Sequence, residues 1–155
     1  MRSLVLLPLS LLFLGLCSCG PAPIFEEVRE LGPGGWAYAD SLTFDVAITD
    51  TTGRQDLRLI VGHTPDFAYQ NFYVRVTTRL PDGRVLSQPV SLQLADKYGN
   101  WYGNCSRGAC TSRIAIQQNL RFRQPGTYRW TVSQFSREDP LPEITALGLG
   151  IAPLP

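Results

Sequence analysis

The sequence predicts an all-β protein, an antiparallel two-sheet β-sandwich of the immunoglobulin-like or jelly-roll-like kind that follows a cleaved lipoprotein signal peptide. Three observations predict it. Apolar and polar residues alternate with a period of two from Ser41 onward, as in strands that bury one face. The 155 residues include 14 glycines and 12 prolines, which favours turns over long helices. A short apolar leader ends at a cysteine pair.

The leader comes first in the chain, as an apolar run from Leu4 to Leu16 behind one arginine. It is too short for the ~20 residues of a membrane-spanning helix, so it is typical of a signal peptide. The order of apolar and small residues before Cys19 fits lipoprotein processing, whereas the same frame at Cys17 places a bulky leucine next to the cut. We predict a signal peptide over 1–18 and lipidation of Cys19. Processing at Cys17 and an ordinary secretory leader remain alternatives.

Residues 19–35 are predicted to form the lipidated N-terminus and its tether. Gly20 stands where an aspartate would retain the protein in the inner membrane, so we expect the outer membrane. No acidic residue lies between Gly20 and Phe25 to signal surface export, which favours the periplasmic face. The stretch Phe25–Leu31 is the one helix candidate, although a linker turn is the favoured interpretation.

The domain itself is predicted over residues 36–155, a length that suits a single core. A turn at Pro81-Asp82-Gly83 combines the fixed φ of proline with a glycine for the left-handed position. About eight strands with one polar face each match a two-sheet sandwich. The expected strands cover residues 41–48, 57–61, 72–80, 90–94, 114–116, 120–122, 128–132 and 147–151.

The charge balance excludes one class of partner. The chain carries 14 basic and 13 acidic residues, and loss of the leader removes Arg2. The mature chain is therefore close to neutral and has no long-range attraction for nucleic acid.

Two cysteines remain after processing, Cys105 and Cys110. In an exported protein they are expected to form a disulfide that closes a small loop. Two free thiols are the alternative. A zinc site is disfavoured because no second pair of ligands accompanies them.

Catalytic chemistry has few candidates. His63 is the single histidine and lies at the end of an expected strand, without a nucleophile elbow or a glycine-rich oxyanion loop. No calcium-loop spacing links the acidic residues, which are expected at solvated strand ends or, for Asp82, in a turn. We expect no enzymatic activity, no cofactor and no metal. The acidic residues considered are Asp45, Asp56, Asp66, Asp82, Asp96 and Asp139.

Trp101 and Tyr102, flanked by glycines, form an aromatic pair that two hypotheses explain. They could form an exposed platform that stacks on sugar rings. The favoured alternative is that they close one end of the core.

A series of short motifs runs in order along nearly the whole mature chain. They are the leader, Trp36, the segment from His63-Thr64-Pro65-Asp66 to Tyr73-Val74, Leu94-Ala95-Asp96 with Gly99-x-Trp101-x-Gly103, Phe122-x-x-x-Gly126-x-Tyr128, and Gln134 with Arg137-Glu138-Asp139-Pro140 and Leu147-Gly148-Leu149. Together these motifs resemble the gliding-motility lipoprotein (GldH) family of Bacteroidetes. The family usually has methionine where this chain has Ser136 and glycine near the place of Glu143, and the pair Cys105 and Cys110 is an addition.

The resemblance implies a non-catalytic cell-envelope lipoprotein that supports gliding and the type IX secretion machinery through protein contacts. Its partners would be the membrane, through the lipid, and other gliding or secretion proteins. A lipid-anchored glycan-binding sandwich is the alternative function. The segment Arg137, Glu138 and Asp139 is a candidate partner-contacting loop, with a solvated turn before the last strand as the other interpretation.

Overall fold

The computed structural model describes residues 22–154, and these contain nine strands and no helix. The expected signal peptide and Cys19 lie outside the described residues. Among residues 22–154, no helix has the length and apolar character that crossing a membrane requires. The strands are β1 (Phe25–Glu30), β2 (Leu42–Ile48), β3 (Gln55–His63), β4 (Asn71–Arg79), β5 (Val85–Gln93), β6 (Asn104–Ser106), β7 (Ala109–Leu120), β8 (Gly126–Gln134) and β9 (Ile144–Pro153).

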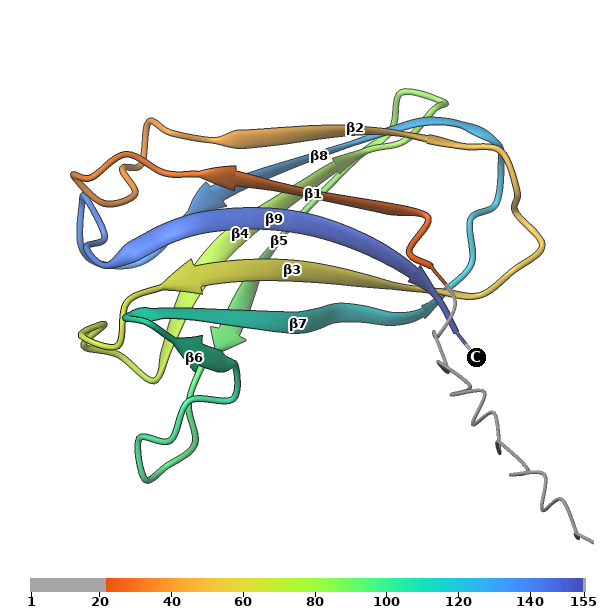
Figure 1. The fold of residues 1–155 in the computed structure, drawn as a ribbon. Coiled ribbons are helices and arrows are strands. Elements are labelled where there is room, and N and C mark those ends of the chain that lie inside the picture. The colour runs from red at the N-terminus through yellow and green to blue at the C-terminus, as the bar shows by residue number, and fades with distance from the viewer. Residues whose placement is uncertain (1–21, 155) are drawn as a thin grey trace, which may run out of the picture.

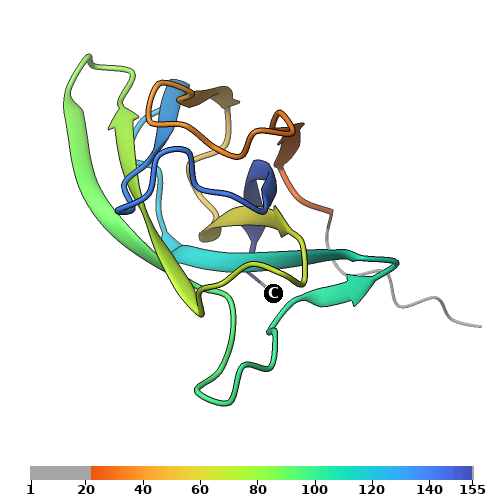
Figure 2. The ribbon, with the colours of Figure 1, turned by 90° about the vertical axis from the view of Figure 1, so that its left-hand side faces the viewer.

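The strands form two antiparallel sheets that pack face to face, as the views in Figures 1 and 2 show. One sheet has the order β1-β9-β3-β7-β6 and the other has the order β2-β8-β4-β5. The chain crosses between sheets at nearly every connection, and the one hairpin within the second sheet joins β4 to β5. Leaving aside the short β6, this eight-strand order is that of a jelly roll. The predicted fold class is confirmed, and the topology selects the jelly-roll form.

The core lies between the sheets and is built from the alternating apolar residues of both. Aromatic side chains concentrate at its two ends, with Trp36 beside Phe72 at one end and Trp130 beside Tyr128 at the other. Alternation explains this placement, because side chains at every second position of a strand share one face. The largest fully buried side chains are Trp36, Trp130, Phe44, Leu59, Ile60, Leu92, Leu94, Leu141, Ile144, Leu147, Leu149 and Ile151.

Three expectations about the elements need correction. The segment Phe25–Leu31 is neither a helix nor a linker turn, because Phe25–Glu30 is β1 and pairs with β9 in a six-residue register. The domain therefore begins before residue 36. Residues 120–122 do not form a separate strand, since β7 runs unbroken to Leu120 and Phe122 lies in the following connection. The short strand β6 was not among the expected strands, and it pairs with the start of β7 at the cysteine pair.

The connections gather at two opposite ends of the sandwich. We name the end where residue 22 enters β1 the tether end, and it carries the connections 49–54, 80–84 and 121–125. The strand registers place them together, since Gln55 pairs with both Leu120 and Pro153, and Ile48 pairs with Gly126. We name the opposite end the far end, which carries the connections 31–41, 64–70, 94–103, 107–108 and 135–143.

Candidate functional site

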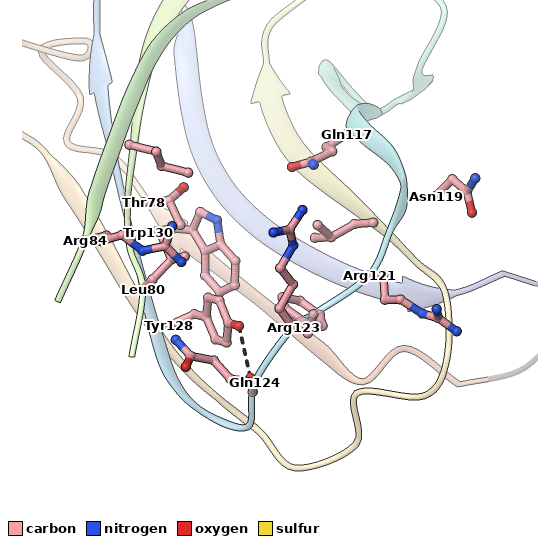
Figure 3. Close-up of a pocket in the computed structure, with 13 residues that line it drawn as sticks. Thr78, Leu80, Arg84, Gln117, Asn119, Arg121, Arg123, Gln124, Tyr128 and Trp130 are labelled. Carbon is pink, nitrogen blue, oxygen red and sulfur yellow. Dashed lines mark hydrogen bonds between the residues drawn. The ribbon is translucent and has the colours of Figure 1, made fainter. Parts of the chain in front are cut away.

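An open hollow lies at each end of the sandwich. The tether-end hollow has a volume of about 660 Å³ and lies where the edges of the two sheets separate between β5 and β7. Figure 3 shows its aromatic wall of Trp130 and Tyr128 and the arginine side chains around it. The far-end hollow, of about 630 Å³, lies between the start of β4 and the 135–143 connection.

The far end carries every exposed aromatic side chain of residues 22–154. Three of them, Tyr69, Tyr73 and Phe135, line the far-end hollow. A backbone hydrogen bond links two of these residues, since the N–H of Phe135 donates to the carbonyl of Tyr73 over 2.9 Å. The exposed aromatics are Tyr38, Tyr69, Tyr73, Tyr98, Tyr102 and Phe135.

The 135–143 connection is held in one conformation from beneath by Gln134. This side chain is 4% exposed, and its amide group bonds both to the N–H of Ser136 and to the carbonyl of Glu138. Farther along, Leu141 forms an isolated bridge with Trp36 through two backbone hydrogen bonds of 2.9 Å. A connection bonded to the core in this way has few alternative conformations.

Two exposed tyrosines fix the acidic part of the same connection. The carboxylate of Asp139 accepts the N–H of Tyr38 over 2.8 Å, and the hydroxyl of Tyr38 donates to the carbonyl of Ser136. The hydroxyl of Tyr69 donates to the carboxylate of Glu138. This hydrogen bond raises the pKa of Tyr69, because the neutral phenol is the form that donates.

Arg137 differs from its two neighbours. It lines the far-end hollow and is exposed, and its side chain has no hydrogen bond or ion pair with any residue between 22 and 154. Of the three candidate partner-contacting residues, Glu138 and Asp139 therefore hold the connection in shape. Arg137 is the one whose guanidinium is available to a partner.

His63 is fully buried at the far end of the core. Its Nδ1 bonds to the carbonyl of Thr64 over 2.8 Å, and its ring lies 4.5 Å from that of Trp101 and 6.0 Å from that of Phe67, centroid to centroid. Burial lowers the pKa of His63, because desolvation disfavours the charged imidazolium. The histidine faces aromatic rings rather than a nucleophile, which is the arrangement of a core residue.

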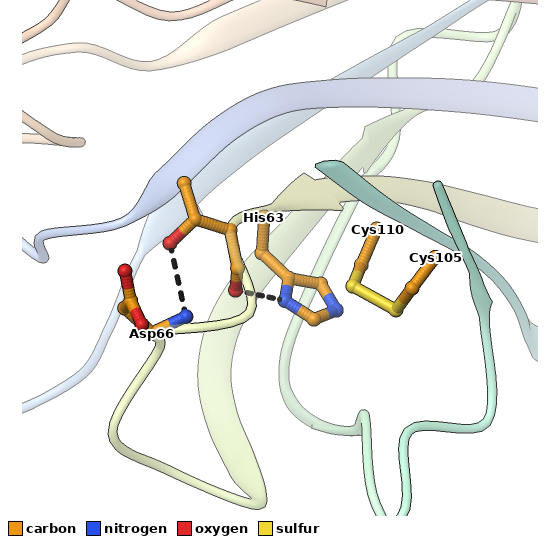
Figure 4. Close-up of a disulfide and its surroundings, with 5 residues drawn as sticks. His63, Asp66, Cys105 and Cys110 are labelled. Atoms are coloured by element: carbon orange, nitrogen blue, oxygen red, sulfur yellow. Dashed lines mark hydrogen bonds between the residues drawn. A yellow bond between two sulfur atoms is a disulfide. The ribbon is translucent and has the colours of Figure 1, made fainter. Parts of the chain in front are cut away.

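The disulfide expected between Cys105 and Cys110 is present, and it joins β6 to the start of β7 beside His63 (Figure 4). Cys110 pairs with His63 across the sheet and is 1% exposed. The bond therefore fastens the short edge strand to the wall of the core.

The two candidate stacking residues are separated by burial. Trp101 is half-buried, and its ring packs on His63, so it closes the far end of the core. Tyr102 is 66% exposed and Tyr98 is 77% exposed, and neither adds its ring to the core. The platform predicted for Trp101 with Tyr102 is thus reduced to the two tyrosines.

The acidic residues serve local structure. Asp96 accepts the backbone N–H groups of Tyr98 and Asn100, and the side-chain hydrogen bond from Asn100 is the leading cause of its lowered pKa. Asp82 accepts both the backbone N–H and the guanidinium of Arg84, which lowers its pKa likewise. Within residues 22–154, no group of three or more His, Cys, Asp or Glu side chains is arranged to hold a metal.

Sequence reasoning did not single out Tyr38, Phe135 or the arginines of the tether end. Nothing in a linear sequence marks Tyr38, because its contacts with Ser136 and Asp139 join residues 98 and 101 positions apart. For the tether end the signal was present, in the pair Arg121 and Arg123 directly after a strand.

Comparison with known proteins identifies relatives that cover most of the chain. A family model described as GldH lipoprotein matches residues 23–151. The gliding motility lipoprotein GldH of Flavobacterium johnsoniae is 25% identical over 133 residues, which cover 85% of this chain and 82% of that protein. A gliding motility lipoprotein GldH homolog of Christiangramia forsetii is 21% identical over 122 residues, or 79% of this chain and 74% of that protein. The match spans the jelly roll from its first strand to its last, and the chain belongs to the GldH lipoprotein family.

Proposed function

We propose that this lipoprotein is a non-catalytic component of the gliding machinery, anchored through Cys19 to the periplasmic face of the outer membrane. In this proposal it contacts a protein of the gliding or type IX secretion apparatus through the far-end hollow. Family membership supports the link to gliding, since both curated relatives are named gliding motility lipoproteins.

One observation carries the proposal, which is the gathering of exposed aromatic residues and a free arginine around a hollow with fixed walls. Aromatic residues and arginine are enriched at protein interfaces and dominate their binding energy. A wall that is already ordered, as Gln134 orders the 135–143 connection, loses little conformational entropy on binding. The far end therefore has the composition and the rigidity of a protein-binding surface.

Charge indicates the chemistry of the partner. The far-end connections contain six acidic residues and three basic ones, so their field attracts a basic surface. We infer a partner with a basic patch whose apolar side chain enters between Tyr69, Tyr73 and Phe135. An acidic group beside that patch would pair with Arg137.

The absence of catalysis is supported by the placement of the titratable groups. His63 is enclosed by Phe67 and Trp101, and Asp82 and Asp96 are engaged in their own turns. Neither hollow is lined by a histidine or an aspartate. These groups have structural roles that need no substrate.

The direct test is charge reversal in the hollow. Arg137→Glu in the chromosomal gene should abolish colony spreading and reduce cross-links to envelope proteins, while the amount of lipoprotein stays normal. Arg107→Glu is the matched control, because Arg107 is also exposed at the far end but does not line the hollow. Normal spreading with unchanged cross-links in Arg137→Glu cells would remove the hollow from the proposal.

Location is tested separately. Protease added to intact cells should leave the protein uncut, whereas the same protease should digest it after the outer membrane is opened. Cys19→Ser should release the protein from the membrane fraction. Digestion in intact cells would place the domain on the cell surface instead.

Glycan binding remains a second candidate because of Tyr98 and Tyr102, which stand on the 94–103 connection with most of their surface exposed. Tyrosine rings of this kind can stack on sugars. A glycan array probed with the wild type and with Tyr98→Ala/Tyr102→Ala would decide, since a silent array or equal signals would count against it.

A further inference from the structure

The tether-end hollow combines an apolar interior with basic residues at its rim. Its apolar lining comes from Leu80, Leu86 and Leu120 and from the rings of Phe122, Tyr128 and Trp130. Leu86 is 60% exposed there, on the inner face of β5 where the two sheets separate. An exposed apolar surface next to a hollow marks a place where the protein can bind an apolar ligand and shield it from water.

Three arginines line this hollow, and no acidic side chain does. Arg84 bonds to Asp82 over 2.7 Å. Arg121 and Arg123 are exposed and form no ion pair with any other residue of the 22–154 range. Figure 3 shows Arg123 between the aromatic wall of Trp130 and Tyr128 and the side chain of Arg121. Two guanidinium groups are thus available beside an apolar interior.

The place of the hollow in the molecule indicates its ligand. Only three peptide links separate Cys19 from Ala22, and that length of chain reaches at most ~11 Å. Ile24 bonds to Ile151 at the end of β9, so the chain from Cys19 enters at the same end as the hollow. If the lipid is on Cys19, the tether end lies at the membrane surface.

We propose that the tether-end hollow binds an anionic phospholipid of the anchoring membrane. Arg121 and Arg123 take the phosphate, and one acyl chain lies against Leu86 and Trp130. Guanidinium groups match phosphate oxygens in charge and geometry. The inference rests on the anchor at Cys19 in the proposed function, and it orients the jelly roll with its far end away from the membrane.

The test measures lipid retention by the full-length lipoprotein in neutral detergent. Phosphatidylglycerol or phosphatidylcholine is added, and native mass spectrometry counts the lipids that stay bound. Phosphatidylglycerol should be retained in preference, and a photoactivatable analogue should cross-link to 80–86 and 121–130. A basic residue near an anionic membrane surface contributes about 1 kcal/mol, or about fivefold in affinity. Arg121→Glu/Arg123→Glu should therefore weaken retention by about 25-fold or more.

A control variant separates the site from net charge. Lys97→Glu/Arg107→Glu changes the charge by the same amount at the far end and should retain the lipid as the wild type does. Equal losses in the two double variants, or equal retention of the two lipids, would overturn the proposal. Free glycerol 3-phosphate at matched concentration should not bind; binding as tight as that of the lipid would mean a phosphate site and would also overturn it.

Folding and anchoring are controlled independently. The arginine side chains are exposed, so thermal unfolding should be unchanged in Arg121→Glu/Arg123→Glu. Arg121→Gln/Arg123→Gln provides a milder variant that should still lose the preference for phosphatidylglycerol. Cys19→Ser protein should show the same preference, since the hollow is intact. Lipid retention is measured on purified protein, whereas the proposed function is tested by colony spreading. The failure of one proposal can therefore be distinguished from the failure of the other.

Discussion

The two ends of the jelly roll are built from the same strands but have opposite surfaces. The tether-end connections are five or six residues long and carry four arginines and two aspartates. Four of the five far-end connections have seven or more residues, and together the five contain six acidic and three basic residues. All exposed aromatics of the described chain lie at or beside the far end. The difference teaches that the strands specify the fold, while the connections give the two ends of the molecule opposite charge and different side chains.

The largest expected effect compares the buried tryptophans of the two ends. Trp36→Ala should lower the free energy of unfolding by ~3–5 kcal/mol, because the ring is fully buried and its indole N–H donates to the carbonyl of Asp40. Trp130→Ala should cost less, since Trp130 borders the tether-end hollow and the lost volume is partly open already. Chemical denaturation of both variants measures the difference. Equal losses would show that the two ends are packed equally well.

A smaller effect is expected from loosening the far end alone. Gln134→Leu leaves the N–H of Ser136 and the carbonyl of Glu138 without their buried partner, which should cost ~1–3 kcal/mol. Hydrogen exchange should speed up over 135–143 and stay unchanged over 80–84 and 121–125. Faster exchange at both ends would mean that the ends are coupled.

The disulfide gives a third test at the far end. Cys105→Ser/Cys110→Ser opens a small loop and should lower the free energy of unfolding by ~2 kcal/mol on the chain-entropy model. The reason is a gain of freedom in the unfolded chain. In the folded protein, β6 pairs with β7 over only three residues, so without the disulfide β6 should separate locally while β3 and β9 remain paired. Thermal unfolding with and without reductant checks this, and a reductant effect that persisted in the double variant would contradict it.

The smallest effect is a pH dependence confined to the far end. Burial lowers the pKa of His63 below 6.5, so the unfolded chain takes up the proton first as the pH falls. Stability from the neutral ring is therefore complete above pH 6.5 and declines below it, by up to about 1.4 kcal/mol per pH unit. Denaturation at a series of pH values should show this slope in the wild type and a flatter one in His63→Leu. Identical slopes would refute the assignment.

The strands could be predicted from the sequence wherever apolar residues alternate, as in Leu42–Ile48 or Tyr128–Val132. β1 could not, because its half-buried positions include Glu27 and Arg29, which pair with each other over 2.7 Å. Its pairing depends on Gly148 of β9, where any Cβ would meet the backbone of Glu27 at 2.6 Å. The pattern of the edge strand is thus set by its neighbour and not by its own residues.

The candidate site was predicted only in part, for a related reason. Arg137, Glu138 and Asp139 could be selected as a charged loop, but the division of their roles depends on tyrosines from distant connections, Tyr38 and Tyr69. In the same way, the tether-end hollow forms only when β4, β5, β7 and β8 bring their ends together. Contacts over such long sequence separations leave no local signal in composition or periodicity.

The pairing of β1 with β9 also determines how the molecule bears mechanical load. β1 starts at the tether end and runs to the far end, so a force applied between residue 22 and the far-end connections acts along the strand axis. Antiparallel hydrogen bonds lie perpendicular to that axis, and the six register pairs of β1 are sheared together instead of being unzipped one by one. Such a force therefore loads the pairing of β1 with β9 in shear along its whole length.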